Sequence, residues 1–201
     1  YSVIKDNTII RCGAQAQGGG HSGIAMEIFG SNNLIDHNDI SHLGDDFSRV
    51  IAGSRNILRN NLWHDNVPAD WPGSVAHVDG MQNWSSTGDL PVQHLLIENN
   101  VMSNSWDNDS HFALFQNYAH LDQRDMVFRY NTGYRVGDGI LGADSAPTPG
   151  IRVYNNTWAV MFNQRYANND GLITFSANST GAKVFNNIFY NSGIVSGYSP
   201  Y

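Results

Sequence analysis

The strongest constraint on how this chain can fold is an internal repeat with an asparagine at its centre. In every copy an apolar residue stands three positions before the asparagine, and in all copies but the one with Gly133 an apolar residue stands two positions after it. The interval between copies varies from 23 residues (Asn38 to Asn61) to 39 residues (Asn61 to Asn100). Such variation indicates one structural unit that carries loops of different length. The seven asparagines are Asn7, Asn38, Asn61, Asn100, Asn131, Asn156 and Asn187.

Asparagine suits a tight turn between two short strands, because it tolerates left-handed backbone and its side chain bonds to nearby backbone groups. Turns that stack on one another also let the side-chain amides hydrogen-bond along the stack. The segments around each asparagine are short and apolar, alternate as strands do, and show no useful helical period. We therefore expect one all-β domain over residues 1–201, a right-handed parallel β-helix of about seven coils with three parallel sheets.

The apolar positions of the repeat are expected to face the core of this solenoid. Trp63 and Trp158 occupy the position two residues after an asparagine, so we expect both to be core residues. The residues three positions before the asparagines are Ile4, Ile35, Leu58, Ile97, Phe128, Val153 and Val184.

Two of the copies illustrate a family resemblance. These copies are Ile97–Val101 (Ile-Glu-Asn-Asn-Val) and Val184–Ile188 (Val-Phe-Asn-Asn-Ile). With such copies along nearly its whole length, the chain resembles the pectate-lyase-like superfamily of right-handed parallel β-helices. That superfamily contains polysaccharide lyases, glycoside hydrolases, epimerases, tailspikes and adhesins. The resemblance implies a polysaccharide or oligosaccharide substrate, but one fold hosts many activities and does not decide the reaction.

The composition excludes several classes of partner. The net charge is −7 and the only lysines are Lys5 and Lys183, so nucleic acid is not expected as a partner. No apolar run is long enough to span a membrane. With one cysteine, Cys12, an intramolecular disulfide cannot form. We expect a monomeric secreted or periplasmic protein, present here as a mature form or as a fragment of a longer chain.

A second strand with polar residues recurs in each coil. The segments His77–Asn83 and His111–Asn117 match at their His, Gln and Asn positions. The alignment predicts one column of Asp79, Ala113, Asp138 and Asp170, with His77 and His111 in another column two positions earlier. Insertions lie on both sides of this strand, so we expect a binding groove over the third to fifth coils.

The sharpest motif in this strand is His77–Gln82. It is similar in shape to the Asn-Thr-Asp-Gly motif of polygalacturonase-like hydrolases, in which the Asp is catalytic, although His77 replaces the Asn and the other motifs of those enzymes are missing. Strict alternation would put His77, Asp79 and Met81 on the same face. Either Met81 therefore faces the groove, or Gly80 forms a bulge that resets the direction of the side chains.

The first mechanism that these residues suggest is β-elimination by a polysaccharide lyase. A base removes the C5 proton of a uronic acid, and a cation such as Ca²⁺ neutralises its carboxylate. The candidate bases are His77, His111 and Arg135. The candidate calcium ligands are Asp79, Asp107, Asp109 and Asp138.

The second mechanism is hydrolysis by an inverting glycoside hydrolase. If Asp79 and Asp138 lie two coils apart, their backbones are roughly 9.6 Å apart at about 4.8 Å per coil. That spacing is close to the ~6.5–9.5 Å between the acid and the base of inverting enzymes. A third alternative, from another class, is a non-catalytic glycan-binding β-helix of the tailspike or adhesin type.

The predicted substrate-binding residues surround the same strand. Aromatic side chains in the insertions are candidates for stacking on sugar rings, since they offer flat apolar faces with polar rims. Amide side chains on the strand are candidates for binding sugar hydroxyl groups. These residues are Trp71, Trp84, Trp106, Gln82 and Gln116.

Overall fold

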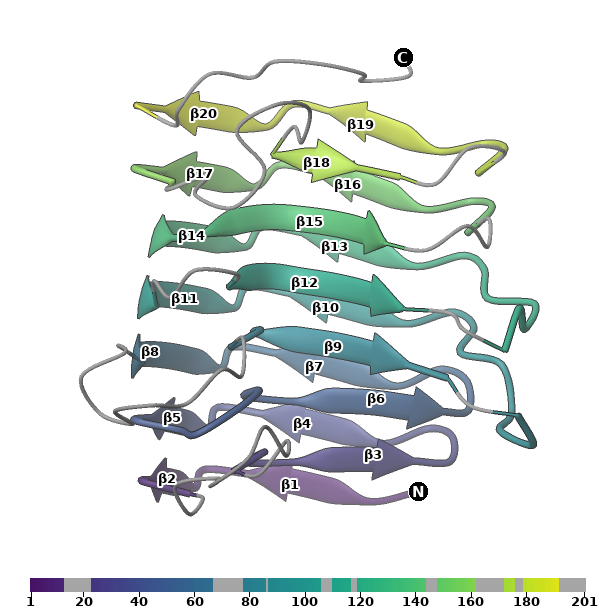
Figure 1. The fold of residues 1–201 in the computed structure, drawn as a ribbon, viewed down its shortest axis with the longest axis horizontal. Coiled ribbons are helices and arrows are strands. Elements are labelled where there is room, and N and C mark those ends of the chain that lie inside the picture. The colour runs from purple at the N-terminus through teal and green to yellow at the C-terminus, as the bar shows by residue number, and fades with distance from the viewer. Residues whose placement is uncertain are drawn as a thin grey trace.

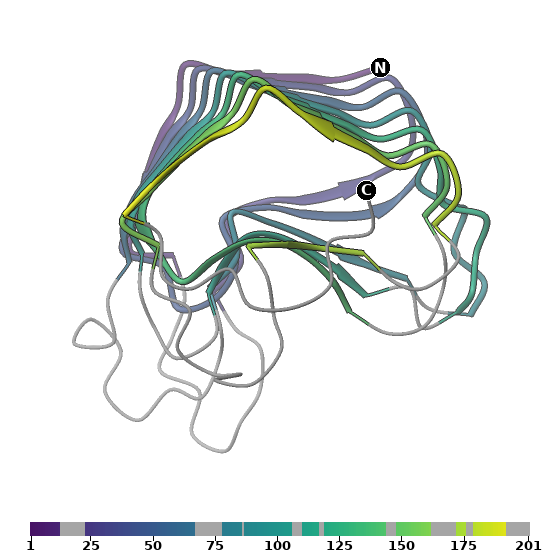
Figure 2. The same cartoon turned by 90° about the horizontal axis from the view of Figure 1, so that it is seen from above.

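The computed structural model describes residues 1–12, 23–66, 78–85, 87–105, 110–116, 119–143, 148–161, 172–175 and 179–191. In these residues all paired strands are parallel, and three sheets follow one another around each coil (Figures 1 and 2). The expected parallel β-helix is therefore confirmed. None of the described segments is a helix that could cross a membrane.

Each sheet takes one strand from each coil in which that strand is described. Sheet A contains β1 (Val3–Lys5), β4 (Leu34–Asp36), β7 (Ile57–Arg59), β10 (Leu96–Glu98), β13 (Val127–Arg129), β16 (Arg152–Tyr154) and β19 (Lys183–Phe185). Sheet B contains β2 (Thr8–Ile10), β5 (Asp39–Ser41), β8 (Leu62–Asn66), β11 (Val101–Ser105), β14 (Thr132–Val136), β17 (Thr157–Ala159) and β20 (Ile188–Tyr190). Sheet C contains β3 (Glu27–Phe29), β6 (Arg49–Ala52), β9 (Met81–Trp84), β12 (His111–Gln116), β15 (Asp138–Ala143) and β18 (Ile173–Thr174).

The turn between sheets A and B carries the asparagines of the repeat, and all seven form one ladder. At each step the backbone N–H and the side-chain amide of one asparagine donate to the side-chain oxygen of the next, over 2.9–3.2 Å. The amide also donates to a backbone carbonyl, as Asn100 does to Leu58 at 2.9 Å. Because the buried amides satisfy one another, the ladder fixes the register of the coils.

We expected the ladder asparagine to be the left-handed residue of this turn. The left-handed residue is instead the one before it. These residues have φ between 53° and 56° and include His37 and Tyr130. The ladder asparagines are not among the residues with positive φ, and their amides bond to the next coil. The seven left-handed residues are Asp6, His37, Asn60, Asn99, Tyr130, Asn155 and Asn186.

The apolar columns of the repeat face the core as expected. Ile97 is fully buried and pairs with Leu58 on one side and Phe128 on the other. Trp63 and Trp158 are also fully buried. Residues of the same columns in the first and last coils are exposed, among them Ile4 and Val184, because no further coil covers them in the described structure.

Gly133 interrupts its apolar column for a steric reason. It lies beside Trp158 in the pairing of β14 with β17. A Cβ at position 133 would approach the Trp158 ring carbon Cε3 to 2.8 Å, which is closer than real contacts allow. The Trp158 ring therefore fills the space that a larger side chain at position 133 would need.

Candidate functional site

Sheet C brings three of the predicted catalytic residues into one column across neighbouring coils. In the pairing of β12 with β15, His111 lies beside Asp138. In the pairing of β12 with β9, Ala113 lies beside Met81, which puts Asp79 at the level of His111. We call Asp79, His111 and Asp138, together with Asp46 of the coil before them, the polar column.

The alignment expected from the sequence, with Asp79 beside Ala113, is therefore wrong by two residues. That alignment matched Gln82 to Gln116, whereas the structure pairs Gln82 with Leu114. The register of the sheet is set by the side chains that face the core. Two segments with similar polar residues can therefore pair in a register that differs from their sequence alignment. The corrected register puts the histidine of one coil directly between the aspartates of its neighbours.

The contacts of His111 define the geometry of the site. Its backbone N–H and its ring Nδ1 both lie 2.9 Å from Oδ1 of Asp79, and its Nε2 lies 4.0 Å from Oδ2 of Asp138. A carboxylate only accepts hydrogen bonds, so Nδ1 carries a proton and donates it. In the neutral ring Nε2 is then the basic nitrogen, on the edge that faces Asp138. Asp79 and His111 are fully buried, and the Asp138 side chain is 11% exposed.

Gly80 explains how Asp79 leaves the core side of the sheet. Met81 is fully buried in the core, and a Cβ on Gly80 would meet the Trp63 ring at 2.8 Å and the Met102 sulfur at 3.0 Å. Two consecutive residues therefore face the core, which turns Asp79 toward His111. Of the two alternatives drawn from the sequence, the change of direction at Gly80 is the correct one.

The polar column continues into the preceding coil, where the sequence did not indicate site residues. Asp46 is fully buried, and its Oδ1 accepts the backbone N–H of Asp79 at 3.0 Å. Its Oδ2 lies 2.7 Å from Nη2 and 3.2 Å from Nε of Arg49. The only sequence signal is the pair Asp45–Asp46 just before a strand that begins with arginine, in the coil with the shortest interval between asparagines.

Three predicted substrate-binding residues also lie together on sheet C. Gln116 pairs with Trp84 across neighbouring strands, and both side chains are partly exposed. Gln82 is buried and donates to the Gln116 side chain at 2.8 Å. His111 and Gln116 stand at opposite ends of β12, roughly 16 Å apart at ~3.3 Å per residue. The polar column and the Trp84–Gln116 pair thus mark the two ends of one sheet surface.

Arg135 lies in a different element from the polar column. It belongs to β14 of sheet B and has a left-handed backbone with φ of 53°. The pairing of β11 with β14 puts it at the level of Asn104, which is also left-handed. Its predicted role as a base stays a prediction.

The remaining predicted residues lie outside the described residues. They are His77, Trp71, Trp106, Asp107, Asp109 and Asp170. In the described part of the chain, no three His, Cys, Asp or Glu side chains are grouped so that they could hold a metal ion. Oδ1 of Asp79 is already engaged by His111, and calcium takes six to eight oxygen ligands. The described residues alone do not fit calcium, and the calcium site stays a prediction.

A second histidine with two carboxylate partners lies on sheet B. His64 contacts Asp65 through Nδ1 at 2.7 Å and Asp39 through Nε2 at 2.8 Å, and Asn104 donates to Asp65 at 3.0 Å. Burial lowers the pKa of His64, but the two carboxylates outweigh it and raise the pKa above its ordinary value. His64 and both aspartates are partly exposed, unlike His111. This group therefore offers a comparison with the polar column.

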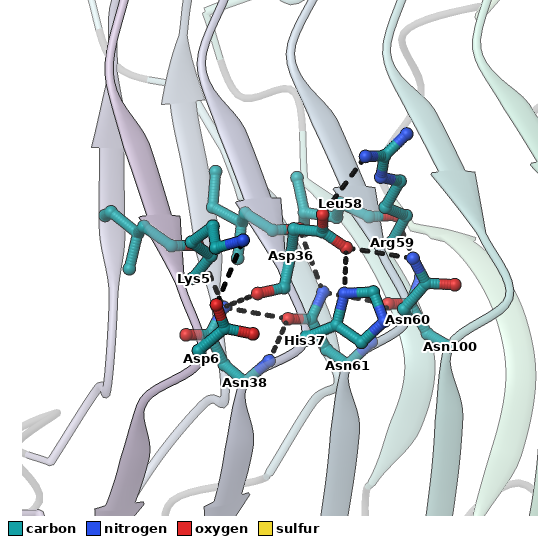
Figure 3. A network of polar contacts seen from close by, with 12 residues as sticks. Lys5, Asp6, Asp36, His37, Asn38, Leu58, Arg59, Asn60, Asn61 and Asn100 are labelled. Atoms are coloured by element: carbon teal, nitrogen blue, oxygen red, sulfur yellow. Dashed lines mark hydrogen bonds and ion pairs between the residues drawn. The ribbon is translucent and has the colours of Figure 1, made fainter.

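A third polar group stabilises the turn beside the asparagine ladder. Figure 3 shows Asp36 between Arg59, His37 and Asn60. Its carboxylate accepts from Arg59 at 3.1 Å and from Asn60 at 2.9 Å, and lies 2.6 Å from His37 Nδ1. Burial raises the pKa of Asp36, but the hydrogen bonds and charges of its partners prevail and lower it to about 2. Asp36 is therefore ionised in the folded protein at neutral pH.

Comparisons of this chain with the models of known protein families, with curated proteins and with solved structures give no match. The chemistry of the polar column is therefore the main indication of function.

Proposed function

We propose that this protein is a carbohydrate-active enzyme of the pectate-lyase-like superfamily, and that it cleaves or modifies a polysaccharide on sheet C. The observation that carries the proposal is the position of His111 between the carboxylates of Asp79 and Asp138. A histidine held at one ring nitrogen by a carboxylate, with the other nitrogen directed at a second acid, is suited to proton transfer near neutral pH.

The reaction that this arrangement supports best is β-elimination on a glycan that contains uronic acid. The C5 proton passes to Nε2 of His111, the bond between C4 and the glycosidic oxygen breaks, and a C4–C5 double bond forms. The leaving oxygen takes up a proton, which Asp138 or solvent supplies. Asp79 stabilises the imidazolium that results, because it already accepts the Nδ1 proton.

The exposed members of the sheet indicate where a sugar would bind. Asp138, whose side chain is 11% exposed, is the member of the polar column nearest to solvent, so a sugar would approach Nε2 of His111 from the side of Asp138. Trp84 and Gln116 at the other end of the strand would bind a more distant sugar of the same chain. The roughly 16 Å between these ends is the reach expected for a polymer rather than for a single sugar.

Inverting hydrolysis is the second candidate, because Asp79 and Asp138 lie two coils apart on either side of His111. An acid–base pair needs one protonated carboxyl group. Oδ1 of Asp79 accepts two N–H groups, which favours the ionised form, so Asp79 is poorly suited to be the acid. Asp138 could be the acid, but Asp79 would then have to act as the base with the carboxylate that holds His111, and this is the reason to favour elimination, with His111 as the base.

The charge of the site bears on the substrate. Carboxylates outnumber cationic groups around the polar column, so a bound uronate must have its own carboxylate neutralised by a proton or a cation. The predicted calcium ion would supply that charge, and the assay is therefore run with a chelator and with added calcium. The acidic groups are Glu27, Asp45, Asp46, Asp79 and Asp138, and the basic ones are Arg49 and His111.

The test is a panel of polyuronates and neutral polysaccharides, read by the absorbance of unsaturated uronate and by reducing ends. A product with the absorbance of unsaturated uronate, formed by the wild type and not by His111→Gln, supports the lyase. Reducing ends without absorbance would replace it with hydrolysis, and isomerised uronate without cleavage would replace it with epimerisation. Binding without any of these products would leave a non-catalytic glycan-binding protein. We also expect Trp84→Ala to weaken oligosaccharide binding by about 1 kcal/mol.

A further inference from the structure

We infer that Arg49 and Asp46 are positioning residues for His111, acting through Asp79 to fix which ring nitrogen exchanges protons. The inference rests on the proposed function only for the reaction that His111 performs. The positioning itself is a property of the folded protein without substrate, so it can be tested separately.

The first step runs from Arg49 to Asp46. The guanidinium lies 2.7 Å from Oδ2 of Asp46, with Asp45 at 3.6 Å and Glu27 at 3.9 Å as weaker partners. Two guanidinium nitrogens engage the same carboxylate oxygen, Oδ2, and anchor that end of the Asp46 carboxylate. The other oxygen of Asp46 is thereby directed toward the next coil.

The second step runs from Asp46 to Asp79. Oδ1 of Asp46 accepts the backbone N–H of Asp79 at 3.0 Å, just before Gly80 turns the chain into β9. A side chain thus caps the residue at which the direction changes. Together with the Phe47 N–H, which donates to the Asp79 carbonyl at 2.9 Å, this contact holds the Asp79 backbone and with it the direction of the Asp79 side chain.

The third step runs from Asp79 to His111. One oxygen of Asp79 accepts both the backbone N–H and the ring Nδ1–H of His111 at 2.9 Å. Two donors from the same residue leave the ring little freedom to rotate or flip. The proton is held on Nδ1, and Nε2 remains the nitrogen that can accept a proton on the Asp138 side.

The burial of the Arg49 pair distinguishes it from the other arginine ion pairs. The Arg59 and Arg129 side chains are 40% and 35% exposed, whereas Arg49 is 10% exposed and its partner Asp46 is fully buried. Burying an ion pair costs desolvation energy that a hydrophobic pair would avoid, so its role is better sought in the geometry that it fixes. Here that geometry continues through Asp79 to His111.

The test measures the tautomer of His111 by long-range ¹H–¹⁵N correlation on protein labelled at histidine, at a pH where the ring is neutral. His111→Gln assigns the signal. Asp46→Asn is the decisive variant, because the introduced amide either presents a donor to Arg49 or flips and loses the Asp79 N–H. Arg49→Met removes the cation and Arg49→Lys restores it. Arg59→Met is the matched control, since Arg59 pairs with Asp36 beside the asparagine ladder.

In the wild type and in Arg59→Met we expect only the tautomer with the proton on Nδ1. Asp46→Asn and Arg49→Met should show a substantial second tautomer, and Arg49→Lys should show less of it. An unchanged His111 signal in folded Asp46→Asn would overturn the inference. An Asp46→Asn chain that fails to fold while Arg59→Met folds would overturn it as well, because the pair would then serve the fold alone.

If the polysaccharide panel yields activity, the same variants should lower kcat by about tenfold or more, with KM little changed and the pH profile shifted. A raised KM with unchanged kcat would contradict positioning. If the panel is silent but the tautomer shifts in Asp46→Asn, the proposed function fails while the positioning of His111 holds.

Discussion

The turn between sheets A and B and the start of sheet C both link successive coils through polar side chains, but they do so in opposite ways. At the turn every coil contributes the same residue, and seven amides satisfy one another. At sheet C successive coils contribute Asp46, Asp79, His111 and Asp138. Amides do not titrate, so a ladder of identical asparagines can only stabilise. A column of different acids and a histidine can hold and move protons.

The difference between the two regions is tested most directly by removing the histidine of the polar column. We expect His111→Gln to lower kcat by about 10²–10⁴, the usual contribution of a general base, because Gln cannot accept and release a proton at neutral pH. Initial rates are measured on the polysaccharide that the panel identifies, at equal concentration of folded protein.

The matched control is His64→Gln, which removes a histidine from the other group with two carboxylates. His64 contacts Asp39 and Asp65 and belongs to sheet B, whereas His111 belongs to sheet C. Its removal should leave the rate within about twofold of the wild type, because the proposed general base, His111, is still present. Equal losses in both variants would show that the polar column has no special role.

The core behind the ladder gives the largest expected effect on stability. Ile97→Ala should lower the free energy of unfolding by about 2–5 kcal/mol, because Ile97 is fully buried between Leu58 and Phe128. Ile4→Ala in the first coil removes the same groups from a side chain that is 37% exposed, and should cost about 1 kcal/mol. Denaturant unfolding followed by tryptophan fluorescence measures both. A loss below about 1 kcal/mol for Ile97→Ala would contradict the assigned core.

The ladder itself should give a smaller effect that depends on position. Asn100→Ala leaves the Asn61 donors and the Leu58 carbonyl without their partner, at a cost of about 1–3 kcal/mol. Asn7→Ala at the exposed end should cost under about 1 kcal/mol. Neither variant should change kcat. A loss of activity in folded Asn100→Ala would show that the ladder and the polar column are coupled.

The difference between the two regions also explains what the sequence could predict. The seven asparagines and their apolar neighbours repeat, and repetition allowed the fold, the ladder and the burial of Ile97 to be predicted without a structure. The left-handed residue was predicted one position too late, because a ladder asparagine and a turn asparagine are the same residue type. Gly133 had no explanation until the ring of Trp158 was placed above it.

The candidate site was predicted only in part, because the start of sheet C does not repeat. The sequence singled out Asp79, His111 and Asp138 but gave them the wrong register, since the pattern left open whether Met81 faces the groove or the direction changes at Gly80. Arg49 and Asp46 were missed altogether. Asp46 and Arg49 are three residues apart, but the contact that ties them to the site runs from Asp46 to Asp79 in the next coil, and no spacing along the chain encodes it.

The smallest of these expected effects concerns pH and the Asp36 group beside the ladder. The pKa of Asp36 is lowered from 3.8 to about 2 in the folded protein, so its contribution to stability is complete above about pH 4 and is lost as the pH falls through 2. The full shift corresponds to roughly 2.4 kcal/mol, but Arg59 is 40% exposed and water screens the pair, so we expect about 1–2 kcal/mol.

Asp36→Asn removes the titration and serves as the control for all other acids. Stability measured by denaturant unfolding should fall more steeply below pH 4 in the wild type than in Asp36→Asn. Parallel curves would mean that Asp36 gains nothing from its partners, and that the turn is stabilised by the asparagine amides alone.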